Sequence, residues 1–136
     1  MADEKKFHCE VLTPQGKAVG LDVISAVVPL VDGLMGFLAG RAPLIAMVGA
    51  GPLRLHESEK AASEYFVAGG FVHMAHNRLS ILAEECQLTS SMDPAKANEL
   101  FEQAKSLASE SLSQRQRRRE ALAVAAARLK AAQSNW

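Results

Sequence analysis

Two hydrophobic periods meet in residues 79–108, which read LSILAEECQLTSSMDPAKANELFEQAKSLA. The first part contains Leu79-Ser80-Ile81, an alternation that places every second side chain on one face of a β-strand. In the second part, apolar residues recur every three or four positions, which is the period of one face of an α-helix. The change of period at Asp93 therefore predicts a β-rich region before it and a helical region after it.

A helix-start signal marks this change. Asp93 can act as the N-cap by accepting a hydrogen bond from a free backbone N–H, and Pro94 fits the first helical position. The predicted apolar stripe of this helix consists of Ala97, Leu100, Phe101, Ala104, Leu107 and Ala108.

A second helix is predicted after a polar interruption at residues 109–113. Ser113 and Gln116 have the spacing of a capping box, which predicts a helix running from there to about Ala132. Its apolar stripe is mostly alanine, and consists of Ala121, Leu122, Ala125, Leu129 and Ala132. We therefore expect residues 91–136 to form an antiparallel two-helix hairpin that buries little surface by itself and needs something to dock on.

Short apolar runs separated by turn residues fill the chain before this point. Leu53-Arg54-Leu55 alternates as a half-buried strand does. The turn signals lie at residues 13–16, 32–33, 57–60, 69–70 and 76–77. Their spacing predicts short antiparallel strands that form a β-sandwich or flattened barrel over residues 1–90.

No motif in the sequence predicts an active site or a metal site. The glycine-rich segment at residues 33–40 lacks the Gly-Lys-Ser/Thr of a phosphate-binding loop, and its glycines suit a tight strand connection. His73 and His76 are a close pair, but side chains three apart on a strand point to opposite faces. Cys9 and Cys86 lie in strand-like patterns and are expected to be buried free thiols. We expect a non-catalytic protein that requires no cofactor.

Charge is unevenly distributed, although 15 basic and 15 acidic residues give a formal net charge of zero. Residues 1–92 carry 7 basic and 10 acidic side chains, whereas residues 93–136 carry 8 basic and 5 acidic ones. The densest cluster is Arg115, Arg117, Arg118 and Arg119, where positive charge near a helix N-terminus opposes the helix dipole. A solvated face, an acidic protein partner and nucleic acid all remain open, but no aromatic residues interleave for base stacking.

The sequence shows no signal for export or for crossing a membrane. Residues 1–6 read MADEKK, and no apolar run follows these charges. The longest uncharged apolar stretch, at residues 42–53, contains two prolines and is far shorter than the ~20 residues that a spanning helix needs. We therefore expect a cytoplasmic protein.

Four motifs follow one another in a specific order. Residues 33–44 read GLMGFLAGRAPL, residues 51–54 read GPLR, residues 66–72 read FVAGGFV, and residues 79–84 read LSILAE. Together with a hairpin headed by Asp93, this order resembles the F-type ATP synthase epsilon subunit family, called delta in mitochondria. The first motif is similar to the family signature Gly-Glu-x-Gly-Ile-x-x-x-His-Ala-Pro-Leu.

The resemblance implies a rotor subunit in the central stalk of a proton-translocating ATP synthase. In that family the sandwich binds the gamma subunit and the membrane c-ring, so that rotation reaches the catalytic head. Leu34 and Arg41 stand where family members often carry Glu and His, and are expected on the c-ring side. The expected location is peripheral, at the cytoplasmic face of the bacterial inner membrane.

The resemblance also implies that the hairpin restrains ATP hydrolysis. The expected contacts to an acidic loop of the catalytic beta subunit are Arg115, Arg117, Arg118 and Arg119, with Arg128 and Lys130 behind them. Relatives that bind a regulatory ATP show Ile/Leu-Asp-x-x-Arg-Ala, and residues 92–97 here read MDPAKA. Asp93 and Lys96 are therefore the candidate ATP-binding residues, although lysine lacks the planar fork of arginine and a helix cap explains Asp93 equally well.

Two alternatives stay open from the sequence. One is a free-standing β-sandwich module whose basic helical tail binds an unrelated protein. The other is a small nucleic-acid-binding protein that uses the arginine cluster.

Overall fold

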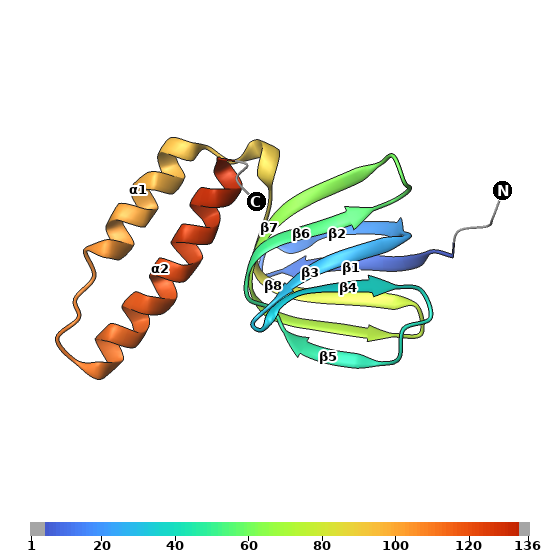
Figure 1. Cartoon of the computed structure of the whole chain (residues 1–136), viewed down its shortest axis with the longest axis horizontal. Helices are drawn as coiled ribbons and strands as arrows, with labels where there is room; N and C mark the ends of the chain where they lie inside the picture. Colours follow the sequence, from blue (N-terminus) through green and yellow to red (C-terminus); the bar gives the residue numbers. More distant parts are fainter. Residues whose placement is uncertain (1–4, 134–136) are drawn as a thin grey trace. The chain divides into compact units, whose positions relative to one another are not determined.

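The computed structural model describes residues 5–133 and divides the chain into two compact units, Met1–Leu88 and Thr89–Trp136. Figure 1 shows the strands of the first unit in blue to yellow and the helices of the second in orange to red. The predictions for residues 1–4 and for the last three residues of the hairpin fall outside the described residues.

The first unit is a β-sandwich made from one eight-stranded sheet, as predicted. Seven strands follow the order β2-β1-β8-β7-β6-β3-β4, and β5 pairs with β7 off this path. The strands are β1 (Phe7–Thr13), β2 (Gly16–Val23), β3 (Ser25–Leu30), β4 (Gly33–Leu38), β5 (Leu44–Met47), β6 (Ala50–His56), β7 (Ala62–Ala75) and β8 (Arg78–Leu88).

One strand pair departs from the antiparallel prediction. β1 runs parallel to β8, with Cys9 opposite Leu79 and Val11 opposite Ile81. All other strand pairs in the described residues are antiparallel. Alternation in the sequence assigns faces and not partners, so it could not reveal that the first and last strands of the unit lie side by side.

The Gly69-Gly70 pair was predicted as a break between strands, and that prediction was wrong. Both residues lie inside β7 and have positive φ angles of 73° and 107°. Before this point β7 pairs with β6, and after it β7 pairs with β5, while β8 pairs with β7 on both sides of it, from Tyr65 to Ala75. A Cβ atom at Gly70 would overlap the carbonyl oxygen of Leu82. Glycine is thus required where the sheet changes partner and folds over itself.

The interior of the sandwich follows the predicted alternation. Leu53 and Leu55 of β6 and Leu79 and Ile81 of β8 are fully buried. They pack with residues of β1, β3 and β4 in one hydrophobic cluster. Apolar burial of this kind is the main force that stabilises the sheet.

The other turn signals match the structure more closely. Gly33 has a φ of 125° at the start of β4, and Gly40 has a φ of 81° just after it. His76 and Asn77 have φ angles of 51° and 57° and form the tight turn between β7 and β8. His76 therefore lies in a turn and not on a strand.

The second unit consists of a 3-10 turn at Thr89–Ser91, α1 (Pro94–Lys105) and α2 (Leu112–Ala132). The predicted start of α1 is confirmed, because the Asp93 side chain accepts a hydrogen bond of 3.0 Å from the Ala95 backbone N–H. Its end was placed too late, since α1 stops at Lys105 and the predicted stripe residues Leu107 and Ala108 lie in the connection. Buried residues on the two helices are alanines, namely Ala97, Ala104, Ala125 and Ala131.

The second helix begins two residues earlier than predicted. Ser111 is the N-cap, and its hydroxyl oxygen accepts a hydrogen bond of 3.1 Å from the Gln114 N–H, while the Gln114 side chain accepts from the Ser111 N–H at 3.2 Å. Ser111 and Gln114 have the same capping-box spacing as Ser113 and Gln116, so local sequence could not separate the two starts. The earlier start places the arginine cluster beyond the first turn, where the helix dipole opposes it less than predicted.

Candidate docking surfaces

A row of exposed apolar side chains crosses the outer face of the sandwich. Met47 of β5 lies opposite Phe71 of β7, and Phe71 lies opposite Leu82 of β8. The three side chains are 55%, 53% and 54% exposed. Leu82 also lies opposite the half-buried Leu12 of β1, so the row continues over a fourth strand. We call Leu12, Met47, Phe71 and Leu82 the outer apolar row.

The backbone explains why this row faces outward. Val72 and Ile81, the sequence neighbours of Phe71 and Leu82, are fully buried, and side chains alternate between the two faces of a strand. Opposed residues on neighbouring strands have Cβ atoms about 5 Å apart, so the row forms one continuous apolar strip. Exposed apolar strips on a folded domain mark sites where another protein binds.

Leu34 and Arg41 lie near opposite ends of the edge strand β4. Leu34 is 56% exposed near the start of the strand, and Arg41 is exposed three residues beyond its end. The Arg41 guanidinium stacks over the Phe37 ring at 5.2 Å and reaches back to within 3.5 Å of the Met35 sulfur. This packing holds the cation along β4, and so the two predicted residues flank one strand without forming a compact site.

Asp93 and Lys96 have separate roles in α1. The Asp93 carboxylate caps the helix, as described above, whereas Lys96 is exposed on its first turn. One exposed lysine next to a carboxylate that already caps the helix offers few hydrogen-bond donors to a nucleotide, because phosphate sites normally combine several donors.

The arginine cluster divides between two surfaces. Arg115, Arg118 and Arg119 follow i, i+3, i+4 spacing and line one cleft together with Ser109. Arg117 points elsewhere, and lines a groove between α1 and α2 together with Arg128. The single contact surface predicted for the four arginines is thereby resolved into two faces of α2.

Arg118 has a structural partner inside the hairpin. Its Nε and Nη2 atoms donate hydrogen bonds of 3.3 Å and 3.2 Å to the backbone carbonyl oxygen of Lys105, the last residue of α1. The final carbonyls of a helix lack partners within the helix, so Arg118 satisfies one of them. By contrast, Arg115, Arg117 and Arg119 make no hydrogen bond or ion pair within residues 5–133.

The two cysteines are free thiols in or beside the core. Cys9 of β1 is buried, and Cys86 of β8 is half-buried. Burial raises the pKa of the Cys9 thiol to about 12, with a smaller contribution from the nearby Cys86, and burial raises the pKa of Cys86 to about 11. A thiol held in its neutral form is a poor nucleophile and a poor metal ligand.

Two other features are absent from the described part of the chain. None of its helices is long and apolar enough to cross a bilayer. None of its histidine, cysteine, aspartate and glutamate side chains gather in a group of three that could hold a metal ion.

A family model for the β-sandwich domain of the ATP synthase delta/epsilon chain matches residues 6–89. The match spans all eight strands described above. The chain belongs to the ATP synthase delta/epsilon family. Relatives of this epsilon-family chain extend the match beyond the sandwich.

Two curated relatives are ATP synthase epsilon chains. The one from Paramagnetospirillum magneticum is 37% identical over 109 residues, which cover 75% of this chain and 82% of that protein. The one from Myxococcus xanthus is 33% identical over 130 residues, which cover 90% of this chain and 95% of that protein.

Two solved structures share the fold of this epsilon-family chain at low identity. A chain of the mitochondrial ATP synthase of Euglena gracilis, in an OSCP/F1/c-ring structure, matches with a TM-score of 0.80 and 21% identity, covering 94% of this chain and 81% of that one. A chain of the Tetrahymena thermophila central stalk/c-ring structure matches with a TM-score of 0.71 and 14% identity, covering 96% and 99%.

The outer apolar row of this epsilon-family chain was not predicted from the sequence. The signal was present, because Phe71-Val72 and Ile81-Leu82 each place two large apolar residues next to each other on a strand. Adjacent residues on a strand cannot both face the same core. One member of each pair must therefore face away from this core, where it is exposed or is covered by another element or another protein.

Proposed function

We propose that this chain is a non-catalytic rotor subunit in the central stalk of a proton-translocating F-type ATP synthase. The observation that carries the proposal is the outer apolar row, on a sandwich of the delta/epsilon family. We assign this row as the face that docks onto the gamma subunit. Rigid attachment there allows proton-driven rotation to reach the catalytic head, where ATP is made.

The edge strand β4 is proposed to lie on the c-ring side. Leu34 stands where relatives often carry a glutamate, so its contact is apolar, while Arg41 supplies a cation that is held in place by Phe37. Attachment to the ring makes the subunit peripheral to the membrane, at the cytoplasmic face of the bacterial inner membrane. Such a subunit needs no spanning segment of its own.

The hairpin is proposed to restrain ATP hydrolysis through the cleft face of α2. Arg115 and Arg119 are exposed and unpaired within the described residues, and so are available to an acidic loop of the catalytic beta subunit. Arg118 supports this face from within by holding α2 to the end of α1. Arg117, the fourth predicted contact residue, lines the groove between α1 and α2 and would reach the beta subunit from another face of α2.

A regulatory ATP at Asp93 and Lys96 is a separate proposal. Lys96 is exposed and can reach a phosphate, and Asp93 would have to contact the nucleotide while capping α1. The supporting observation is the sequence of residues 92–97 alone.

Binding to a purified cognate gamma subunit tests the central proposal. We expect Phe71→Glu to weaken this binding by at least about 30-fold, because burying a charge in an apolar interface costs about 2 kcal/mol or more. Leu38→Glu is the matched control, since Leu38 is 63% exposed, apolar and outside the row. Failure of the unmodified chain to bind gamma at micromolar concentration, or equal losses in both variants, would contradict the assignment.

Truncation after Ser91 tests the regulatory part. The shortened chain should still bind gamma, and the reconstituted catalytic head should hydrolyse ATP faster than it does with the full chain. Replacing Arg115 and Arg119 by alanine should weaken inhibition at low salt, where exposed charges are least screened. Hydrolysis that is unchanged by truncation would remove the inhibitory role while leaving gamma binding intact.

A further inference from the structure

The strand β4 forms an open edge of the sandwich. Within residues 5–133 it pairs with β3 and with no other strand, so one of its sides has no strand beside it. The backbone of β3 shows which groups of β4 face that side. The Pro29 carbonyl accepts a hydrogen bond from the Gly49 N–H, and so it points away from β4. Backbone groups alternate in direction along a strand, and Val28 and its opposite residue Met35 therefore bond to each other across the pair.

Three residues of β4 turn their backbone groups toward the open side. They alternate with the residues that bond to β3, and they are Leu34, Gly36 and Leu38. Each of them offers one N–H and one C=O group, and together they span about 14 Å at the rise of a β-strand. We call these backbone groups the β4 edge. A row of unpaired backbone groups of this kind is a template on which another strand can pair.

The Arg41 side chain lies against the β4 edge. Its Nη1 atom is 3.5 Å from the Gly36 carbonyl oxygen, which agrees with the outward direction of that carbonyl. The same guanidinium stacks over the ring of Phe37, a residue that is buried in the core. Arg41 makes no ion pair within the described residues. An unpaired cation at a strand edge disfavours basic and apolar partners and attracts a carboxylate.

A hollow with a volume of about 460 Å³ borders the β4 edge. Val27 of β3 and Leu38 of β4 line it, and Leu38 is 63% exposed. Gly36 also lines the hollow, and a Cβ atom added there meets no other atom within 4 Å. Opposed residues on paired strands point to the same face, so the side chain opposite Gly36 on an added strand would enter this space.

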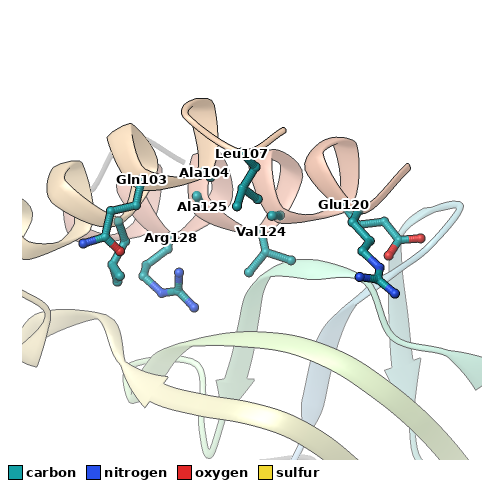
Figure 2. Close-up of a pocket in the computed structure, with 10 residues that line it drawn as sticks. Gln103, Ala104, Leu107, Glu120, Val124, Ala125 and Arg128 are labelled. Carbon is teal, nitrogen blue, oxygen red and sulfur yellow. The ribbon is translucent and has the colours of Figure 1, made fainter. Parts of the chain in front are cut away.

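The groove between α1 and α2 lacks these selective features. Figure 2 shows Leu107, Val124 and Ala125 lining that groove. The helices on either side of it bond their inner backbone groups within themselves, so the groove presents side chains and no unpaired backbone. At the β4 edge, by contrast, backbone groups, a hollow and a cation together define the chemistry of the occupant.

A second copy of this chain is a poor occupant of the β4 edge. Antiparallel pairing of two β4 strands about a twofold axis would place Gly36 opposite Gly36, with the Arg41 guanidinium of each copy beside that pair. Two cations brought together at an exposed edge repel each other. A strand that carries a carboxylate at this point is attracted by the same guanidinium.

We propose that the β4 edge binds an extended segment of another protein by antiparallel strand addition. The segment has a large apolar side chain opposite Gly36 and a carboxylate on an adjacent residue, which meets Arg41. Adjacent side chains on a strand point to opposite faces, so the apolar one enters the hollow while the acidic one reaches the Phe37 side. The proposal rests on the ring-side assignment of β4 only for the identity of the protein that supplies the segment.

A short peptide tests the proposal on the full-length chain. The probe is a fluorescein-labelled peptide of eight residues that alternates threonine and valine and carries a central leucine followed by an aspartate. A second peptide has asparagine in place of the aspartate. Fluorescence anisotropy should give a Kd of about 10–100 µM for the aspartate peptide and about fivefold weaker binding for the asparagine peptide, because one exposed charge pair changes affinity by roughly that factor.

Backbone methylation shows whether the peptide is added as a strand. In one peptide N-methyl groups replace the amide hydrogens of the leucine and of every second residue from it, and in another they replace those of the alternate set. The leucine set faces β4 in antiparallel pairing, so its methylation should weaken binding at least about tenfold, whereas methylation of the other set should change it less than about threefold. Equal losses in the two methylated peptides would overturn strand addition.

Variants of the chain test the cation and the hollow. Arg41→Gln should weaken the aspartate peptide about fivefold and the asparagine peptide less than about twofold. Lys60→Gln removes an exposed cation elsewhere on the sandwich and should affect neither peptide. Gly36→Val fills the hollow and should weaken both peptides at least about fivefold, while its unfolding in urea stays close to that of the unmodified chain. Equal losses in Arg41→Gln and Lys60→Gln would show non-specific attraction and contradict the proposal.

Three other results would also overturn it. The first is that neither peptide binds at concentrations up to about 500 µM, which is weaker than a specific strand-addition contact. The second is sedimentation of the unmodified chain as a dimer that Gly36→Val dissociates, because a second copy would then occupy the edge. The third is loss of peptide binding in Phe71→Glu, which would place the peptide on the outer apolar row. Phe71→Glu is expected to lose gamma docking and to keep peptide binding, so failure of this proposal is distinguished from failure of the stalk function.

Discussion

Replacing Arg118 by alanine should loosen the hairpin, although Arg118 belongs to a run of like charges that looks expendable. Arg118 lies on the second turn of α2 and donates two hydrogen bonds to the Lys105 carbonyl oxygen at the end of α1. These bonds join the two helices across the connection at residues 106–111. Alanine at this position leaves the carbonyl to water and removes the link.

The expected magnitude follows from the exposure of this contact. A hydrogen bond from a charged donor contributes about 1.5–3 kcal/mol when it is well shielded. Arg118 is only half-buried, so water replaces part of the loss and salt screens the rest. We expect a loss of about 1 kcal/mol, which corresponds to a roughly fivefold increase in opening of the hairpin.

Hydrogen exchange followed by mass spectrometry measures this opening directly. In Arg118→Ala, amides in the last turn of α1 and in residues 106–111 should exchange about fivefold faster, because local opening controls exchange there. Peptides from β7 and β8 should be unchanged. Arg115→Ala is the matched control, since Arg115 is exposed and makes no bond within the described residues.

The reasoning is refuted if the two variants behave alike. Equal exchange in Arg118→Ala and the unmodified chain would show that the two hydrogen bonds contribute nothing to the hairpin. Faster exchange in Arg115→Ala by the same factor would show that loss of charge, and not loss of the Lys105 contact, is responsible.

Three further predictions concern the fold and the ATP proposal. Gly70→Ala should destabilise the sandwich by about 2–4 kcal/mol in denaturant unfolding, because the φ of Gly70 is 107° and a Cβ there would overlap a neighbouring carbonyl. Gly36→Ala is the matched control and should be nearly neutral, since a Cβ at Gly36 meets open space. The free energy of unfolding should fall above pH 9, because burial raises the pKa of Cys9 from 9.0 to about 12 and the unfolded state therefore releases this proton first. The expected loss is about 1.5 kcal/mol between pH 9 and 10.5. Cys9→Ala should lack this part of the pH dependence. Asp93→Ala should lower the free energy of unfolding by about 1 kcal/mol, because it removes the cap of α1. Lys96→Ala should leave thermal stability unchanged and weaken ATP binding about fivefold in calorimetry. Unchanged ATP affinity in Lys96→Ala would contradict the proposed site.

The sequence by itself determined the division into a β-region and a helical hairpin. Hydrophobic period is a local property, and it changes at Asp93 regardless of what either region packs against. The cap of α1 is local as well, because Asp93 and the Ala95 N–H are two residues apart. Turn glycines such as Gly33 and Gly40 were predictable for the same reason.

Only the tertiary structure decided which strands are partners and which side chains remain on the surface. The parallel pairing of β1 with β8, the change of partner at Gly70 and the alignment of Met47, Phe71 and Leu82 join residues that are far apart in the chain. The arginine cluster is the clearest case. Four charges look equivalent in the sequence, but Arg118 finds the Lys105 carbonyl thirteen residues away and Arg117 turns toward the groove. Local backbone geometry determines the strand and helix regions, the turns and the cap of α1. Packing between distant segments determines the strand partners and the exposed side chains, because a partner across a sheet or a hairpin leaves no periodic trace in the residue order.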